Sequence, residues 1–107
     1  MIDYSDNFLR EAKKLSKKFK LQKDDLESVV KSIEEDNDLG VYLGYNLYKK
    51  RVSNSSIPTG KSGGFRVIIY KKVENKVVLI SINSKTYKDT LSDDELKVIL
   101  KNYMESK

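Results

Sequence analysis

Apolar residues in the first third of the chain recur at helical spacing. One set predicts an amphipathic helix over about residues 5–19, whose start Ser5 can cap: Phe8, Ala12, Leu15 and Phe19. A second set predicts a helix capped by Asp24 that ends near residues 34–38, because acidic side chains there oppose the helix dipole: Leu26, Val29, Val30 and Ile33. A short link joins the two, so we expect an antiparallel helical hairpin.

The periodicity of the middle of the chain is that of strands. Residues 46–52 predict a strand whose side chains alternate between two faces. Residues 65–73 and 76–84 predict two nearly continuous apolar strands, joined by a tight turn at residues 74–75. Continuous apolar runs are typical of strands at the centre of a sheet with a covered face.

A capping box near the C-terminus predicts a last helix. Ser92 and Glu95 have the required spacing, and an apolar stripe follows them: Leu96, Ile99, Leu100 and Tyr103. The element order is therefore α-α-β-β-β-α. We expect an α+β fold, with a small antiparallel sheet packed by the N-terminal helical hairpin and the C-terminal helix, in one domain over residues 1–107.

Composition excludes several kinds of chemistry. The chain has no cysteine and no histidine, so it has no disulfide, no thiolate metal site and none of the usual imidazole bases. Acid–base chemistry would have to use Lys, Arg, Tyr or a carboxylate, and we expect neither a metal nor a cofactor. The N-terminus does not resemble a secretory signal and no apolar run could span a bilayer, so we expect a cytoplasmic protein.

Positive charge is concentrated in the middle of the chain. Residues 41–91 hold ten lysines and arginines against two acidic residues, whereas the segments on either side are slightly acidic. A field of this kind attracts polyanions.

The run Gly60-Lys61-Ser62 resembles the end of a phosphate-binding loop, but it fails two tests of one. The earlier glycine that such a loop needs is replaced by Ser55, and a strand over residues 65–70, not a helix, follows. A flexible loop that enters a sheet is the better interpretation.

Several cations lie where the predicted strands could bring them together. Lys49 and Arg51 share one face of the first strand, and Arg66 interrupts an otherwise apolar strand, where it needs an acceptor or an anion. Further candidates lie in the loop before the second strand and after the third: Lys61, Lys85, Tyr87 and Lys88. Converging cations could hold a few phosphates, and tyrosines could stack on bases: Tyr48, Tyr70 and Tyr87. The alternative is that these charges form the solvated face of a sheet.

Four segments together resemble the RelE/HigB branch of the RelE/ParE toxin superfamily: residues 46–52, residues 60–70 with the sequence Gly-Lys-Ser-Gly-Gly-Phe-Arg-Val-Ile-Ile-Tyr, residues 76–85, and residues 92–96. The resemblance covers most of the chain. It implies a RelE-like fold and the toxin of a bacterial toxin–antitoxin pair, which enters the ribosomal A site and cuts mRNA without a metal. It also implies an antitoxin partner.

The resemblance also implies roles for individual residues. Lys49 would be the base or a charge stabiliser, Arg51 a phosphate clamp and Arg66 the stabiliser of the transition state. Lys85, with help from Tyr87, would lie near the leaving oxygen, and the RNA-binding set would be Lys61, Tyr87 and Lys88. Lys50 departs from the apolar residue expected between the two active cations, and its stem would have to snorkel.

Two rival functions remain open at this point. One is a ParE-like inhibitor that blocks DNA gyrase by binding, without cleavage, and the other is an RNA-binding module without catalysis. A pure inhibitor needs no set of cations that converge on a phosphate, and in a simple binding module Arg66→Ala should only weaken the affinity for RNA.

Overall fold

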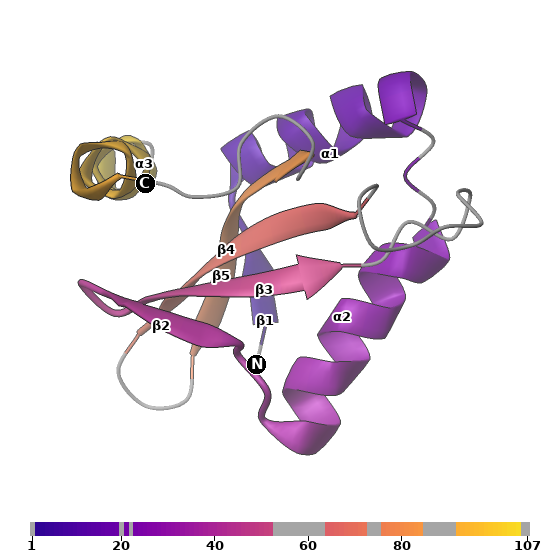
Figure 1. The fold of residues 1–107 in the computed structure, drawn as a ribbon, viewed down its shortest axis with the longest axis horizontal. Coiled ribbons are helices and arrows are strands. Elements are labelled where there is room, and N and C mark those ends of the chain that lie inside the picture. The colour runs from indigo at the N-terminus through magenta and orange to yellow at the C-terminus, as the bar shows by residue number, and fades with distance from the viewer. Residues whose placement is uncertain are drawn as a thin grey trace.

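A five-stranded sheet organises the computed structural model, which describes residues 2–19, 21, 23–52, 64–72, 76–84 and 92–105. The strand order is β1-β5-β4-β3-β2, and all neighbouring strands are antiparallel except β1 and β5, which are parallel. The elements along the chain are β1 (Ile2–Tyr4), α1 (Asp6–Phe19), α2 (Lys23–Asp36), β2 (Val41–Gly44), β3 (Leu47–Val52), β4 (Phe65–Lys71), β5 (Val77–Ser84) and α3 (Asp93–Glu105) (Figure 1).

The predicted fold class is confirmed, and the sheet is larger than expected. The three central strands, β3, β4 and β5, form the predicted antiparallel sheet, but the edge strands β1 and β2 were missed. Because β1 adds in parallel, the sheet is mixed rather than wholly antiparallel. Both edge strands have only three or four residues, too few to show a strand period.

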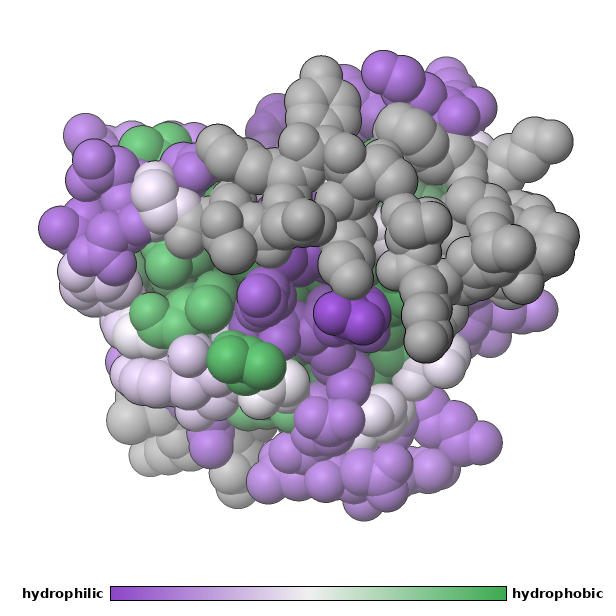
Figure 2. Space-filling model, viewed as in Figure 1, coloured by the Kyte–Doolittle hydropathy of each residue, from purple (hydrophilic) through white to green (hydrophobic). Residues whose placement is uncertain are grey.

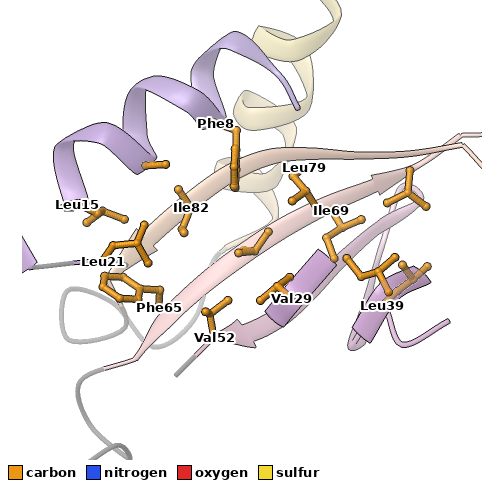
Figure 3. Packing of buried hydrophobic residues seen from close by; sticks show 14 residues of the cluster. Phe8, Leu15, Leu21, Val29, Leu39, Val52, Phe65, Ile69, Leu79 and Ile82 are labelled. Atoms are coloured by element: carbon orange, nitrogen blue, oxygen red, sulfur yellow. The ribbon is translucent and has the colours of Figure 1, made fainter. Parts of the chain in front are cut away.

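Helices α1 and α2 cover one face of the sheet. Figure 3 shows their apolar side chains packed against alternating residues of the central strands. The cluster on this face contains Phe8, Leu15, Val29, Val52, Phe65, Val67, Ile69, Leu79 and Ile82, among others. The helix α1 lies mainly over β5 and α2 over β3. This is the larger of the two apolar cores.

Helix α3 covers part of the opposite face. Its cluster is smaller and contains Leu47, Ile68, Val78, Ile80, Leu96 and Tyr103. The predicted capping box opens this helix: the Ser92 amide donates to Glu95 at 3.0 Å, and the Glu95 amide donates to the Ser92 hydroxyl at 3.2 Å. Because α3 contacts mainly β5, it leaves the rest of this face for other side chains.

The helix starts were predicted with mixed success. Ser5 caps α1 as expected, since its hydroxyl accepts a hydrogen bond from the Phe8 amide at 3.0 Å. The prediction of Asp24 as a cap was wrong, because α2 begins at Lys23 and Asp24 lies within its first turn. An aspartate there still favours the helix through its dipole. In the described part of the chain, no helix has the length and apolarity needed to cross a membrane.

Candidate functional site

Three cations from two neighbouring strands point to the same face of the sheet. Along β3, Lys49 and Arg51 alternate with side chains that face α1 and α2, such as Val52. Along β4, Arg66 lies between Phe65 and Val67, which also belong to the α1 and α2 side. Because successive strand residues point to opposite faces, all three cations lie on the side of α3. We call Lys49, Arg51 and Arg66 the cationic cluster.

The pairing register brings this cluster together. Arg51 lies directly opposite Arg66, and Lys49 lies opposite Ile68, the next residue of β4 on the same face. Directly opposite residues have Cβ atoms about 5 Å apart, so the two guanidinium groups start from neighbouring positions. Like charges in such a pair repel each other. An anion between them would remove that repulsion, which is how a phosphate is usually held.

Burial differs among the three cations. Arg66 is 3% exposed, Lys49 is half-buried and Arg51 is exposed. The cluster therefore runs from the interior of the sheet to its surface, and a bound anion would be partly shielded from water.

A pocket of about 430 Å³ adjoins the cluster. Eight residues line it: Asp38, Gly40, Val41, Lys49, Lys50, Arg51, Phe65 and Arg66. Figure 2 shows hydrophilic side chains gathered in the middle of the visible face, with hydrophobic ones beside them toward α3. The lining combines residues of β3 and β4 with the segment that leads into β2.

Gly40 lets this wall approach the strand closely. Its φ is +86°, a conformation that favours glycine, and a Cβ atom there would clash with the carbonyl oxygen of Lys49. The side chain of Asp38 holds the same segment, because it accepts a hydrogen bond from the Gly40 amide at 3.0 Å. The Lys49 carbonyl is therefore packed closely against the segment that leads into β2.

Lys50 lies on the opposite face and is paired. Its side chain is 10% exposed, and its ammonium group donates to Asp38 at 2.9 Å. This hydrogen bond, followed by the Gly40 amide, holds the pKa of Asp38 below its ordinary value. Asp38 thus balances Lys50, the unexpected cation of β3, and leaves the positive charge of the cationic cluster in place.

Two of the tyrosines predicted to stack on bases pack against other tyrosines. Tyr48 lies on the face of α1 and α2, opposite to the cluster, and its ring packs on Tyr42 with centroids 5.0 Å apart. Tyr70 packs on Tyr103 of α3, with centroids 5.7 Å apart. Both rings therefore contribute to packing, Tyr48 on the face opposite to the cationic cluster, and their role in base stacking stays a prediction.

The structure does not test the other predicted site residues. Lys61, Lys85, Tyr87 and Lys88 lie outside the described residues, so their roles stay predictions. As for metals, the described residues contain no group of three or more acidic side chains that could hold an ion.

Asn83 was not among the predicted site residues. It lies on β5 directly opposite Arg66, so the row Arg51, Arg66 and Asn83 crosses three strands on one face. Simple alternation along β5 would have placed Asn83 with Leu79, on the other face. A register shift between Ile68 and Ile69 of β4 changes this, and the sequence alone carries no signal of it.

Comparisons with known proteins bear on the fold and on the family. A family model described as the RelE toxin of the RelE/RelB toxin–antitoxin system matches residues 7–105. The solved structures include an arginine-to-alanine double mutant of the E. coli toxin RelE in the free state. It matches with a TM-score of 0.52 and 16% identity, over 98% of this chain and 94% of that chain. No curated protein matches the chain. At this identity the structural match supports the fold, and the family model supports the family.

Proposed function

The chain belongs to the RelE toxin family, and from that premise we propose that it is a metal-independent endoribonuclease that cleaves mRNA in the ribosomal A site. Cleavage would stop translation and so make the protein toxic to the cell that produces it. The observation that supports the cleavage reaction is the position of Arg51 directly opposite Arg66, with Lys49 on the same face.

The reaction that fits these groups is attack within the RNA strand. The ribose 2′-oxygen forms a bond to the adjacent phosphorus while the bond from phosphorus to the 5′-oxygen breaks. The products are a 2′,3′-cyclic phosphate and a 5′-hydroxyl. The 2′-OH proton must be accepted, the 5′-oxygen must receive a proton, and the negative charge on the phosphorane must be stabilised.

We assign the steps to the cationic cluster as follows. Arg51 holds the phosphate with its guanidinium fork, and Arg66 stabilises the charge that develops on the non-bridging oxygens. Lys49 either accepts the 2′-OH proton in its neutral form or adds to the stabilisation as a cation. Lys85 would protonate the 5′-oxygen, with help from Tyr87. The phosphate-binding set would continue with Lys61 and Lys88.

An antitoxin partner is the second part of the proposal. The RelE family is defined by toxin–antitoxin systems, and a free protein with this concentration of positive charge would bind polyanions without selection. We therefore propose that a cognate antitoxin binds the chain and neutralises it until the toxin is released. The ribosome and its mRNA would then be the partners of the released toxin.

The decisive experiment maps mRNA 5′ ends in bacterial cells that express the chain from an inducible promoter. We expect new ends within translated frames, which appear soon after induction, and none in an Arg66→Ala variant. Arg10→Ala is the matched control, because Arg10 is an exposed arginine on α1, outside the cationic cluster. Intact mRNA together with halted replication would contradict cleavage and favour the gyrase-inhibitor function. Slowed translation with intact mRNA would also contradict cleavage, and it would favour an RNA-binding module without catalysis.

A further inference from the structure

A bulge in β5 determines which of its residues face the cationic cluster. Ile69 pairs with Leu79, but the preceding residue of β4, Ile68, pairs with Ser81, so Ile80 is an extra residue in the ladder. Leu79 and Ile82 both belong to the core under α1 and α2, although two residues lie between them, a spacing that regular alternation would put on opposite faces. The bulge thus reverses the alternation beyond Ile80, and Asn83 points to the side of Arg66.

Side chains near the start of α1 hold this bulge in place. The carbonyl of Ile80 accepts hydrogen bonds from the Ser5 hydroxyl and from the Asn7 side-chain amide, both at 3.2 Å. Oε1 of Glu11 accepts from the Ser81 hydroxyl at 2.9 Å and from the Ile82 amide at 3.3 Å. Backbone groups that a bulge takes out of the ladder are therefore satisfied by α1. The register shift is a supported feature of the fold.

The bulge leaves Asn83 with a side-chain acceptor that none of the described residues uses. Its Oδ1 atom is buried, and among the described residues no donor reaches it. The residue as a whole is half-buried. A buried acceptor without a partner is costly, so a site where one persists merits a functional explanation.

An acceptor is the one kind of group that the cationic cluster lacks. Lysine ammonium and arginine guanidinium groups only donate hydrogen bonds, so they can hold phosphate oxygens but cannot accept from a hydroxyl. Among the described residues that line the adjoining pocket, Asp38 is the acidic one, and its two carboxylate oxygens accept from the Gly40 amide and the Lys50 ammonium group. Asn83 lies directly opposite Arg66, so its carbonyl is an acceptor that the strand register brings next to the cationic cluster.

We propose that Oδ1 of Asn83 accepts a hydrogen bond from a ribose 2′-OH while Arg51 and Arg66 hold the adjacent phosphate. This inference rests on the proposed function and adds a substrate-contacting residue to it. The contact orients the attacking hydroxyl and distinguishes RNA from DNA, because the 2′-OH is the group that differs between them. Asn83 does not take the proton away; it fixes the direction of the hydroxyl.

The test uses two single-stranded oligonucleotides of identical base sequence that resist cleavage. One carries 2′-amino sugars, which still donate a hydrogen bond, and the other carries 2′-fluoro sugars, which do not. We expect the wild-type chain to bind the 2′-amino oligonucleotide about fivefold more tightly, as one hydrogen bond gives. In Asn83→Leu this ratio should fall to about one, while the affinity for the 2′-fluoro oligonucleotide changes less than about twofold.

Three further variants make the result specific. Asn83→Ala also removes the acceptor but introduces a smaller side chain, so it replaces the leucine variant if leucine disturbs the fold. Asn83→Asp keeps an acceptor and should retain the preference for 2′-amino sugars, with weaker binding overall because the new charge repels phosphate. Asn102→Leu, at an exposed position of α3, is the matched control and should keep the wild-type ratio.

The inference is overturned if the wild-type chain binds both oligonucleotides equally, binds neither, or keeps its preference in both Asn83→Leu and Asn83→Ala. The outcome can be separated from that of the proposed function. A chain that cuts mRNA in cells but shows no 2′-amino preference contradicts only the role of Asn83. A chain that shows the preference but leaves mRNA intact contradicts the cleavage reaction and leaves the contact standing.

Discussion

The two ends of the sheet face beneath α3 are built from the same three strands and differ completely in character. At one end, Leu47, Tyr70 and Val78 belong to or pack against the apolar cluster under α3. At the other end, four or five residues further along each strand, the face presents Arg51, Arg66 and Asn83. One end contributes to stability, and the other presents charge and hydrogen-bonding groups.

This contrast indicates how a small sheet can hold a binding site with little loss of its apolar core. The opposite face carries the larger apolar cluster along the full length of the strands, so the polar end of the α3 face can hold cations while its strands remain anchored. Strand pairing fixes the backbone at both ends alike. Stability and activity should therefore respond separately to substitutions at the two ends.

The largest effect should come from Arg66, at the polar end. Arg66→Met keeps the length of the side chain and removes the charge, so we expect mRNA cleavage to fall about 10³-fold because transition-state charge is no longer stabilised. Cleavage is measured in a translation extract by primer extension, and folding is checked by thermal unfolding. Arg10→Met, on α1, should cleave like the wild-type chain. Cleavage within about tenfold of wild type in Arg66→Met would remove Arg66 from the mechanism.

The apolar end should show the reverse pattern. Leu47 is fully buried, so Leu47→Ala should lower the free energy of unfolding by about 2–5 kcal/mol, through lost burial and the cavity that remains. Urea denaturation followed by circular dichroism measures this loss. The fraction that stays folded should still cleave mRNA at the wild-type rate. A loss of cleavage greater than the loss of folded protein would show that the two ends are coupled.

Much of the contrast between the two ends of this face could be predicted from the sequence, because it follows from patterns of neighbouring residues. Alternation along residues 46–52 placed Lys49 and Arg51 on a common face, and the apolar run around Arg66 marked a central strand. The caps Ser5 and Ser92 were visible for the same reason: each acts over three residues.

What the sequence could not predict depends on contacts between distant segments. The strand β1 exists because Ile2–Tyr4 pairs with β5, about 75 residues later in the chain. The strand β2 ends in a two-residue turn in which Tyr45 and Asn46 have φ angles of 54° and 60°, and tyrosine is unusual in that conformation. The bulge that turns Asn83 toward Arg66 depends on side chains of α1.

A smaller effect is expected from a comparison of the two faces of β3. The Asp38 carboxylate pairs with Lys50 on the face of α1 and α2, whereas the cationic cluster lies on the other face. Asp38→Asn should lower the melting temperature, since it leaves the buried Lys50 ammonium without its partner. The double variant Asp38→Asn/Lys50→Met removes both charges and should recover most of the loss. Cleavage by the double variant should remain close to wild type, because Lys50 lies on the other face. A double variant less stable than Asp38→Asn would contradict this account of the pair.

The smallest effect concerns Glu11, which supports the bulge that gives the polar end its third residue. Burial raises the pKa of Glu11, and this outweighs the opposing hydrogen bonds from Ser81, Ile82 and Asn7 and the attraction of Lys14. The folded state therefore binds its proton more tightly than the unfolded state does. The resulting stability is fully present below the ordinary glutamate pKa of about 4.3 and is lost as the pH rises through the higher pKa of the folded state.

Glu11→Gln removes the titratable carboxyl group but keeps a side-chain carbonyl that can accept the hydrogen bonds from Ser81 and Ile82. The stability of the wild-type chain relative to Glu11→Gln should therefore increase as the pH is lowered from neutral toward the ordinary glutamate pKa. Urea denaturation of both proteins at a series of pH values measures this difference in the free energy of unfolding. Glu35→Gln, at an exposed position of α2, is the matched control. If the difference between wild type and Glu11→Gln does not change with pH, or decreases as the pH is lowered, then burial does not dominate at Glu11, and the link between α1 and the bulge is weaker than its hydrogen bonds indicate.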